Sequence, residues 1–266
     1  MIPRRIAGLL SLFGASLAAS CGTLEPTPAT GLNVRRFEGT VSYRVSYRYL
    51  LYLPEGYVRD TASRWPLLLF LHGSGERGDD LALVRRHGPP KLLASGGALP
   101  FVVVAPQCPE GERWRADALA ALLDDVTRRL RIDPERVYAT GLSMGGRGTW
   151  DLAMSHPDRF AAIAPVCGGA LPDRACNLKR VPVRAFHGAK DDVVPLSESE
   201  RVVEAVRRCG GTAELVVFPE AGHDSWTSAY SDPSLWDWLL SHRPRGGKEY
   251  TISRLAPGRG AVPGGL

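Results

Sequence analysis

The chain has 266 residues, of which 44% are hydrophobic, 23% charged and 8% aromatic, and its formal net charge is +5. These fractions are ordinary for a globular protein and exclude a collagen, a disordered tail protein and a multi-span membrane protein. The charge lies at the two ends, because residues 1–20 carry +2 and 243–266 carry +4, which leaves −1 for 21–242. We therefore expect no nucleic-acid partner.

Residues 1–20 have the order of a secretory signal peptide. Arg4 and Arg5 precede the apolar run Ile6–Ala19, and small residues lead up to Cys21. The run is shorter than the roughly 20 apolar residues that span a bilayer, and a buried N-terminal helix is the alternative. We therefore expect export. Cleavage before Cys21 would give a lipoprotein, anchored to the membrane through an acylated Cys21; a periplasmic or simply secreted protein is the other outcome.

The rest of the chain divides into three segments by composition. The Pro- and Thr-rich stretch 21–34 is typical of a linker or tether. Residues 243–266 are rich in Gly, Pro and Arg and have few large apolar side chains, which is typical of a disordered basic tail. Between them, 35–242 is expected to form one catalytic domain.

Short apolar runs alternate with helical patterns through this domain. Pro66–Leu71 and Phe101–Ala105 are continuous apolar runs, which are typical of strands buried on both faces of a parallel sheet. Tyr43–Leu53 alternates like an exposed antiparallel strand. The remaining expected strands are Arg136–Thr140, Phe160–Val166, Val181–Phe186 and Glu214–Phe218, and the expected helices are Asp117–Leu130, Arg147–Ser155, Ser197–Cys209 and Leu235–Leu240. This order predicts an α/β fold: a doubly wound, mostly parallel sheet with helices on both faces.

A Gly-x-Ser-x-Gly string lies between one of these strands and the next helix. Ser143 is its serine, and Gly141 and Gly145 flank it. This context favours a nucleophile elbow, in which a tight turn presents the serine at a helix N-terminus. A structural serine in an ordinary turn is the alternative.

A catalytic serine needs a base and an orienting acid. Two later strands end in suitable residues: Val181–Phe186 leads to Asp191 and Asp192, and Glu214–Phe218 leads to His223. Open α/β sheets bind ligands beyond the carboxyl ends of their strands. The sequence therefore predicts a Ser143, His223 and Asp triad at that edge.

The loop after Pro66–Leu71 reads His72-Gly73-Ser74-Gly75. A Gly-rich loop there can offer a backbone N–H, expected from Ser74, opposite that of Met144, and the two would hold a tetrahedral oxyanion.

Together these residues resemble the α/β-hydrolase superfamily over nearly all of 41–242. The strings FLHGSGERG (70–78), APQCP (105–109), GLSMGGRGTWDLA (141–153), FHGAKDDVVP (186–195) and GHDSW (222–226) are similar to secreted bacterial esterases and predicted peptidases of the dienelactone-hydrolase and prolyl-oligopeptidase-related branch. The resemblance assigns the acid to Asp191 over its neighbour Asp192. Dienelactone hydrolases proper use a cysteine nucleophile, so Ser143 favours general ester cleavage here.

We thus expect an exported serine hydrolase that cleaves carboxylic esters through an acyl-enzyme and without a cofactor. A serine peptidase acting on short peptides or amides is the alternative, and a non-catalytic surface binding protein is a third hypothesis that the intact triad disfavours. No His, Cys and Asp spacing indicates a metal site. The substrate and the oligomeric state stay open.

Two tryptophans and four cysteines complete the candidates. Trp114 and Trp226 would line the acyl or alcohol pocket or pack in the core. In an exported protein the cysteines can form disulfides, and Cys167–Cys176 would be a short bridge. Three full pairings stay open among Cys108, Cys167, Cys176 and Cys209.

Overall fold

The computed structural model describes residues 37–39, 42 and 44–243. The chain divides into two units, Met1–Arg44 and Val45–Leu266, and every helix and strand below belongs to the second. The predicted signal peptide (1–20), the linker (21–34) with Cys21, and the basic tail (243–266) except Arg243 lie outside the described residues.

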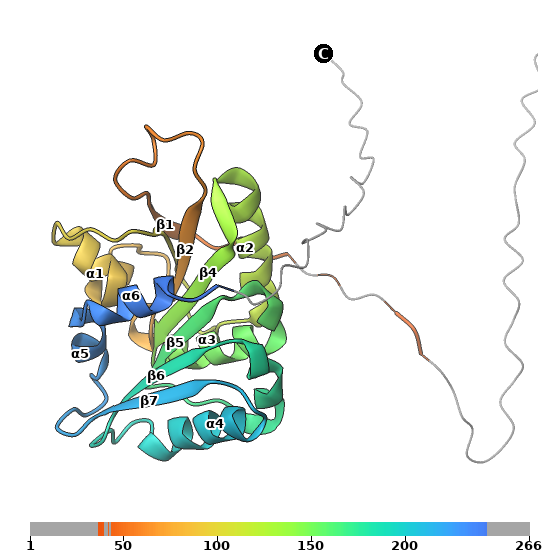
Figure 1. Cartoon of the computed structure of the whole chain (residues 1–266), viewed down its shortest axis with the longest axis vertical. Helices are drawn as coiled ribbons and strands as arrows, with labels where there is room; N and C mark the ends of the chain where they lie inside the picture. Colours follow the sequence, from red (N-terminus) through yellow and green to blue (C-terminus); the bar gives the residue numbers. More distant parts are fainter. Residues whose placement is uncertain (1–36, 40–41, 43, 244–266) are drawn as a thin grey trace, which may run out of the picture. The chain divides into compact units, whose positions relative to one another are not determined.

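One sheet of seven strands forms the centre of the second unit, with the order β1-β3-β2-β4-β5-β6-β7 (Figure 1). Strand β1 pairs antiparallel with β3, and the other neighbours are parallel. The strands are β1 (Tyr49–Tyr52), β2 (Trp65–Leu71), β3 (Val102–Pro106), β4 (Ile132–Leu142), β5 (Ala162–Val166), β6 (Val183–Gly188) and β7 (Ala213–Phe218). The predicted α/β class with a mostly parallel sheet is confirmed.

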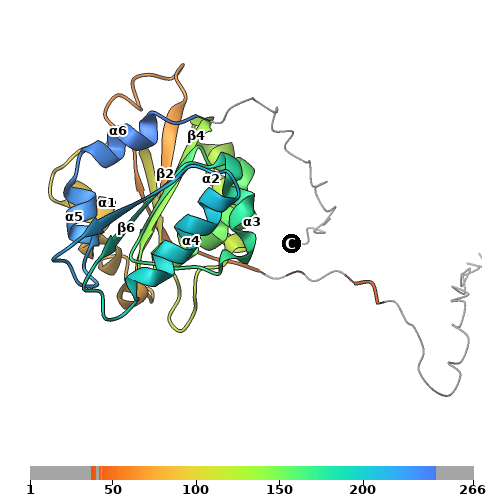
Figure 2. The ribbon, with the colours of Figure 1, turned by 60° about the horizontal axis from the view of Figure 1, so that its bottom comes forward.

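Helices cover both faces of this sheet, as the two views show together (Figures 1 and 2). The α-helices are α1 (Gly88–Ala94), α2 (Ala116–Arg129), α3 (Met144–Ser155), α4 (Leu196–Arg208), α5 (Trp226–Ser231) and α6 (Ser234–Leu240). The 3-10 helices are η1 (Ser74–Glu76), η2 (Leu83–Arg86), η3 (Pro157–Arg159) and η4 (Pro172–Arg180). Helices α2, α3 and α4 pack on one face, and α1, α5 and α6 on the other. Among the described residues, none of these helices has the length and apolar character needed to cross a membrane.

Strand β2 shows why the sheet needs both layers. Leu67, Leu69 and Leu71 point into the core under α2, α3 and α4, whereas Leu68 and Phe70 point into the opposite core. All five are fully buried. Because successive side chains of a strand alternate between faces, a continuous apolar run is stable only between two covering layers.

The direction in which strands are added reverses beside the centre of the sheet. Strand β2 lies between β3 and β4, so the chain leaves β2 toward one side and returns on the other. Leu71, which ends β2, is in register with Gly141 near the end of β4. The loops that follow these two strands therefore start side by side, which is where doubly wound sheets bind ligands.

Three local expectations differ from the structure. The strand expected over Tyr43–Leu53 is shorter, because β1 pairs with β3 over only four residues. Helices α1 and α5 were not expected, since they are short and lie in segments rich in Gly, Pro and polar residues. Neither helix has a long apolar stripe of its own. Each is stabilised by packing on the sheet face that it shares with α6.

The predicted disulfide between Cys167 and Cys176 is wrong. The disulfide joins Cys176 on η4 to Cys209 after α4, with 5.2 Å between their Cα atoms. Cys167 follows β5 and is buried in the other core layer, and Cys108 is likewise free and buried. The prediction relied on nearness in sequence. In the structure η4, which carries Cys176, packs against α4, which leads to Cys209.

Candidate active site

Ser143 lies at a strained turn between β4 and α3. Its φ of 53° and ψ of −116° are unusual for a residue with a side chain. A Cβ on Gly145 would overlap the carbonyl oxygen of Leu71, so the close approach of the turn to β2 requires glycine there. The Ser143 amide donates to the carbonyl oxygen of Val166 at 3.0 Å, which fixes the turn to β5. This is the geometry of a nucleophile elbow.

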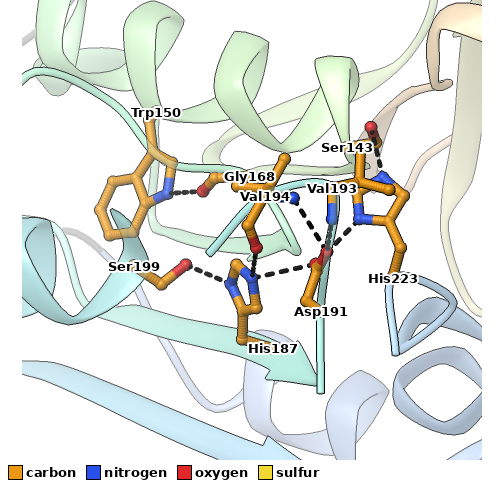
Figure 3. Close-up of polar contacts among 9 residues, drawn as sticks. All are labelled: Ser143, Trp150, Gly168, His187, Asp191, Val193, Val194, Ser199 and His223. Carbon is orange, nitrogen blue, oxygen red and sulfur yellow. Dashed lines mark hydrogen bonds and ion pairs between the residues drawn. The ribbon is translucent and has the colours of Figure 1, made fainter. Parts of the chain in front are cut away.

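The structure brings Ser143, His223 and Asp191 into one hydrogen-bonded chain (Figure 3). The distance from His223 Nε2 to Ser143 Oγ is 2.9 Å, and that from His223 Nδ1 to Asp191 Oδ2 is 2.8 Å. The three residues come from the loops after β4, β6 and β7, so the parallel sheet aligns them at one edge. Asp192 is exposed and makes no contact with this chain of residues in the described part of the protein.

The side chain of Asp191 is fully buried yet favours its ionised form. Burial alone would raise the pKa of Asp191, but hydrogen bonds from His223 and from the amides of Val194 and Val193 outweigh it and lower the pKa. Both amides donate to Oδ1 at 2.9 Å. A buried carboxylate with this set of donors is suited to hold an imidazole and to stabilise its cation.

A second histidine lies against the same carboxylate, a contact that the sequence pattern does not predict. His187 Nε2 lies 3.1 Å from Asp191 Oδ2 and 2.9 Å from the carbonyl oxygen of Val194. Its Nδ1 lies 2.7 Å from Ser199 Oγ on α4 (Figure 3). Since a carbonyl oxygen can only accept, Nε2 carries the proton and donates it to Val194, and Asp191 Oδ2 lies close to the same nitrogen.

The candidate oxyanion donors begin two helices. Ser74 is the first residue of η1 and Met144 the first of α3. Within the described residues, neither backbone N–H donates a hydrogen bond to the protein. Both groups therefore remain available to an oxyanion above Ser143.

His72 and Trp114 hold the loop between β2 and η1 in place through hydrogen bonds. His72 Nε2 accepts the Cys108 amide at 3.0 Å, and Trp114 Nε1 donates to the His72 carbonyl oxygen at 3.1 Å. Burial lowers the pKa of His72 to about 4, so its ring is neutral at neutral pH. Trp114 belongs to the hydrophobic core, which favours its packing role over pocket lining.

Trp226 packs beside His223. It is partly exposed, and its ring packs edge-on against His223 and His87, with 5.4 Å between ring centroids in each case. That Trp226 lines the substrate pocket stays a prediction. Among the described residues, no three His, Cys, Asp or Glu side chains are grouped to hold a metal ion.

The sheet order and the elbow between β4 and α3 define the class of fold: the chain has the α/β-hydrolase fold. Residues 109–232 match the family model of the dienelactone hydrolase family.

Known proteins agree with this class. The chain is 30% identical over 184 residues to NocK of Nocardia uniformis subsp. tsuyamanensis, named as a candidate esterase, covering 56% of this chain and 53% of NocK. It is 36% identical over 103 residues to a candidate carboxymethylenebutenolidase of Methylorubrum extorquens, covering 35% of each chain. A crystal structure of a thermostable esterase aligns with a TM-score of 0.65 and 30% identity, over 75% of this chain and 60% of that one. The chain thus spans about half or less of the two curated relatives.

Proposed function

We propose that the protein is an exported serine hydrolase that cleaves carboxylic esters. The observation that carries this proposal is the hydrogen-bonded chain from Ser143 through His223 to Asp191, built on a strained elbow. The esterases and the carboxymethylenebutenolidase among the similar proteins support the ester class.

The mechanism follows from the protonation states that the geometry imposes. His223 Nδ1 donates to Asp191, which leaves Nε2 free to accept the Ser143 hydroxyl proton as Oγ attacks the ester carbonyl. Asp191 stabilises the imidazolium, and the N–H groups of Ser74 and Met144 bind the oxyanion. His223 then protonates the departing alcohol, and water releases the acyl group by the same steps in reverse.

Replacement of the nucleophile tests this proposal. The purified protein should hydrolyse short-chain aryl esters, and Ser143→Ala should lower kcat by at least about 10⁴-fold, because the remaining groups have no nucleophile to activate. A fluorophosphonate probe should label Ser143 in the wild-type protein only. A wild-type protein that neither turns over esters or amides nor takes up the probe would exclude a hydrolase.

A panel of acyl groups then separates ester from amide cleavage. Acetyl, butyryl and feruloyl esters are compared with aminoacyl amides, and we expect the esters to have the higher kcat/KM. Faster turnover of the amides would assign the same triad to a peptidase.

Export belongs to the proposal as well. The signal-like N-terminus and the Cys176–Cys209 disulfide both support an oxidising compartment. We infer a periplasmic, membrane-anchored or secreted protein, and the mass of the mature N-terminus distinguishes acylated Cys21 from simple cleavage.

A further inference from the structure

The carboxylate of Glu76 lies beside the proposed nucleophile and has no part in the triad. Glu76 ends η1, three residues after Gly73. A Cβ on Gly73 would lie 3.2 Å from Glu76 Oε2 and 3.7 Å from Ser143 Cβ, so these two atoms are at most about 7 Å apart. The Glu76 side chain is only 9% exposed. A carboxylate is therefore held close to the place where the oxyanion forms.

Among the described residues, the ion-pair neighbour of the Glu76 carboxylate is His87. Within the described residues no donor forms a hydrogen bond to the Glu76 carboxylate, and His87 Nε2 is 3.7 Å from Oε1, beyond hydrogen-bond distance. Arg77, the next residue, donates instead to the carbonyl oxygens of Ser74 and Glu112. A carboxylate that no protein donor occupies can accept a positively charged partner from the substrate.

A series of contacts connects Glu76 to the proposed nucleophile. Glu76 faces His87, the ring of His87 packs on Trp226, Trp226 packs on His223, and His223 binds Ser143. Glu76 in turn reaches back to within about 7 Å of Ser143. These five residues, which we call the Glu76 subsite, place one carboxylate among aromatic rings. Carboxylates and aromatic faces together favour cationic groups.

We propose that the Glu76 subsite binds a positively charged nitrogen of the substrate, so that the preferred esters carry an ammonium group on their acyl or alcohol side. This inference rests on the proposed function. The Glu76 carboxylate repels the oxyanion that forms from a neutral ester. A cation on the substrate neutralises this carboxylate, and the attraction between the cation and the oxyanion grows as the oxyanion develops. Anionic esters are excluded for the same reason.

Two pairs of esters with matched shapes test the subsite. On the alcohol side, acetylcholine is compared with 3,3-dimethylbutyl acetate, and on the acyl side, methyl 6-aminohexanoate is compared with methyl heptanoate. Charge is the main difference within each pair. In one pair we expect the wild-type kcat/KM to favour the cation by at least about tenfold, which is the scale of one close charge pair in a partly buried site. The responding pair identifies the side that carries the cation.

Glu76→Gln keeps the size of the side chain and removes its charge. We expect the preference for the cation to fall to about twofold or less, since the amide attracts a cation far more weakly. The ratio of the two esters is measured within one preparation, so a smaller folded fraction of the variant cancels. Glu204→Gln is the matched control, because it removes an exposed carboxylate on α4 and should leave the ratio unchanged.

Two results would overturn the subsite while leaving the proposed function intact. One is a wild-type protein that hydrolyses neutral esters as well as or better than their cationic partners. The other is a Glu76→Gln variant that loses activity equally on both members of a pair, which would make Glu76 a structural residue. If the wild-type protein hydrolyses no ester and Ser143 takes up no fluorophosphonate, the proposed function itself is wrong.

Discussion

Asp191 accepts three hydrogen bonds, and a second histidine, His187, lies beside the same carboxylate. The amides of Val193 and Val194 donate to Oδ1 and His223 Nδ1 donates to Oδ2, whereas His187 Nε2 donates to the Val194 carbonyl oxygen and lies 3.1 Å from Oδ2. Ser199 donates to the other nitrogen of His187 and fixes its tautomer. His187 touches no reacting atom, so it is a positioning residue that acts through the proposed orienting acid.

Removal of the donor on His187 should therefore slow the reaction without weakening substrate binding. In His187→Leu we expect kcat to fall about 10- to 100-fold with KM nearly unchanged, as for other groups that orient a catalytic side chain. His187→Gln keeps an N–H donor of similar reach and should recover most of kcat. Steady-state kinetics on a neutral aryl ester measure both effects.

The thermal midpoint separates this positioning role from a merely structural one. His187 is fully buried, so both substitutions are expected to lower the midpoint, and His187→Gln need not be the more stable variant. Equal kcat values for the Leu and Gln variants, or a wild-type kcat for His187→Leu, would contradict the assignment.

The sequence was sufficient to predict which residues lie together where their position depends on the topology. Ser143, Asp191 and His223 each follow a parallel strand, and parallel strands bring their carboxyl ends to one edge. His187 was expected only to shape a loop around the site, and neither its contact with Asp191 nor the nearness of Glu76 to Ser143 was predicted. Their contacts depend on the direction of a side chain within a loop, which hydrophobic periodicity does not encode.

At the scale of elements, burial on both faces made the strands recognisable. The apolar runs in β2 and β3 have no polar position, because each face of the sheet is covered. By contrast, α1 and α5 have seven and six residues, too short for a helical period to be read from the sequence. Their conformation comes from the packing surface that the sheet presents.

The Cys176–Cys209 disulfide ties η4 to the end of α4 across 33 residues of chain. In the loop-entropy account such a bridge stabilises the folded protein by about 3–4 kcal/mol. We expect the double variant Cys176→Ser/Cys209→Ser to unfold at a lower temperature in a calorimetric scan, with kcat at 25 °C changed by less than about twofold. Ser143 and His223 contact neither cysteine.

A reducing agent provides the matched control for this prediction. It should lower the midpoint of the wild-type protein toward that of the double variant and leave the double variant unchanged, because Cys108 and Cys167 are already free thiols. Coincident midpoints for the oxidised wild type and the double variant would show that the bridge does not stabilise the fold.

For the whole molecule, net charge carries little information about the substrate. The value of +5 arises from the two ends, whereas residues 21–242 sum to −1. The proposed cation preference depends instead on one local carboxylate near Ser143, that of Glu76, whose ion-pair neighbour in the described part of the chain is His87 at 3.7 Å. A sequence-wide sum averages out a single buried carboxylate, so the charge count could not have indicated a cation subsite.

Acid stability of the whole fold should depend on His72, which is buried with both ring nitrogens hydrogen-bonded. Burial lowers its pKa in the folded protein from 6.5 to about 4. The unfolded chain therefore binds a proton first as the pH falls, so stability is complete above pH 6.5 and is lost between 6.5 and about 4. The predicted loss is up to about 3 kcal/mol in the free energy of unfolding.

Urea unfolding at a series of pH values measures this dependence, and His72→Gln isolates the contribution of His72. The glutamine amide has an oxygen to accept the Cys108 N–H but no group that titrates, so the variant should be less stable at pH 7 and lose less stability on acidification. Other groups, such as Asp191 with its lowered pKa, titrate equally in both proteins and cancel in the difference. Parallel curves for the two proteins from pH 7 to pH 4 would mean that His72 takes up its proton without unfolding the loop that carries Ser74.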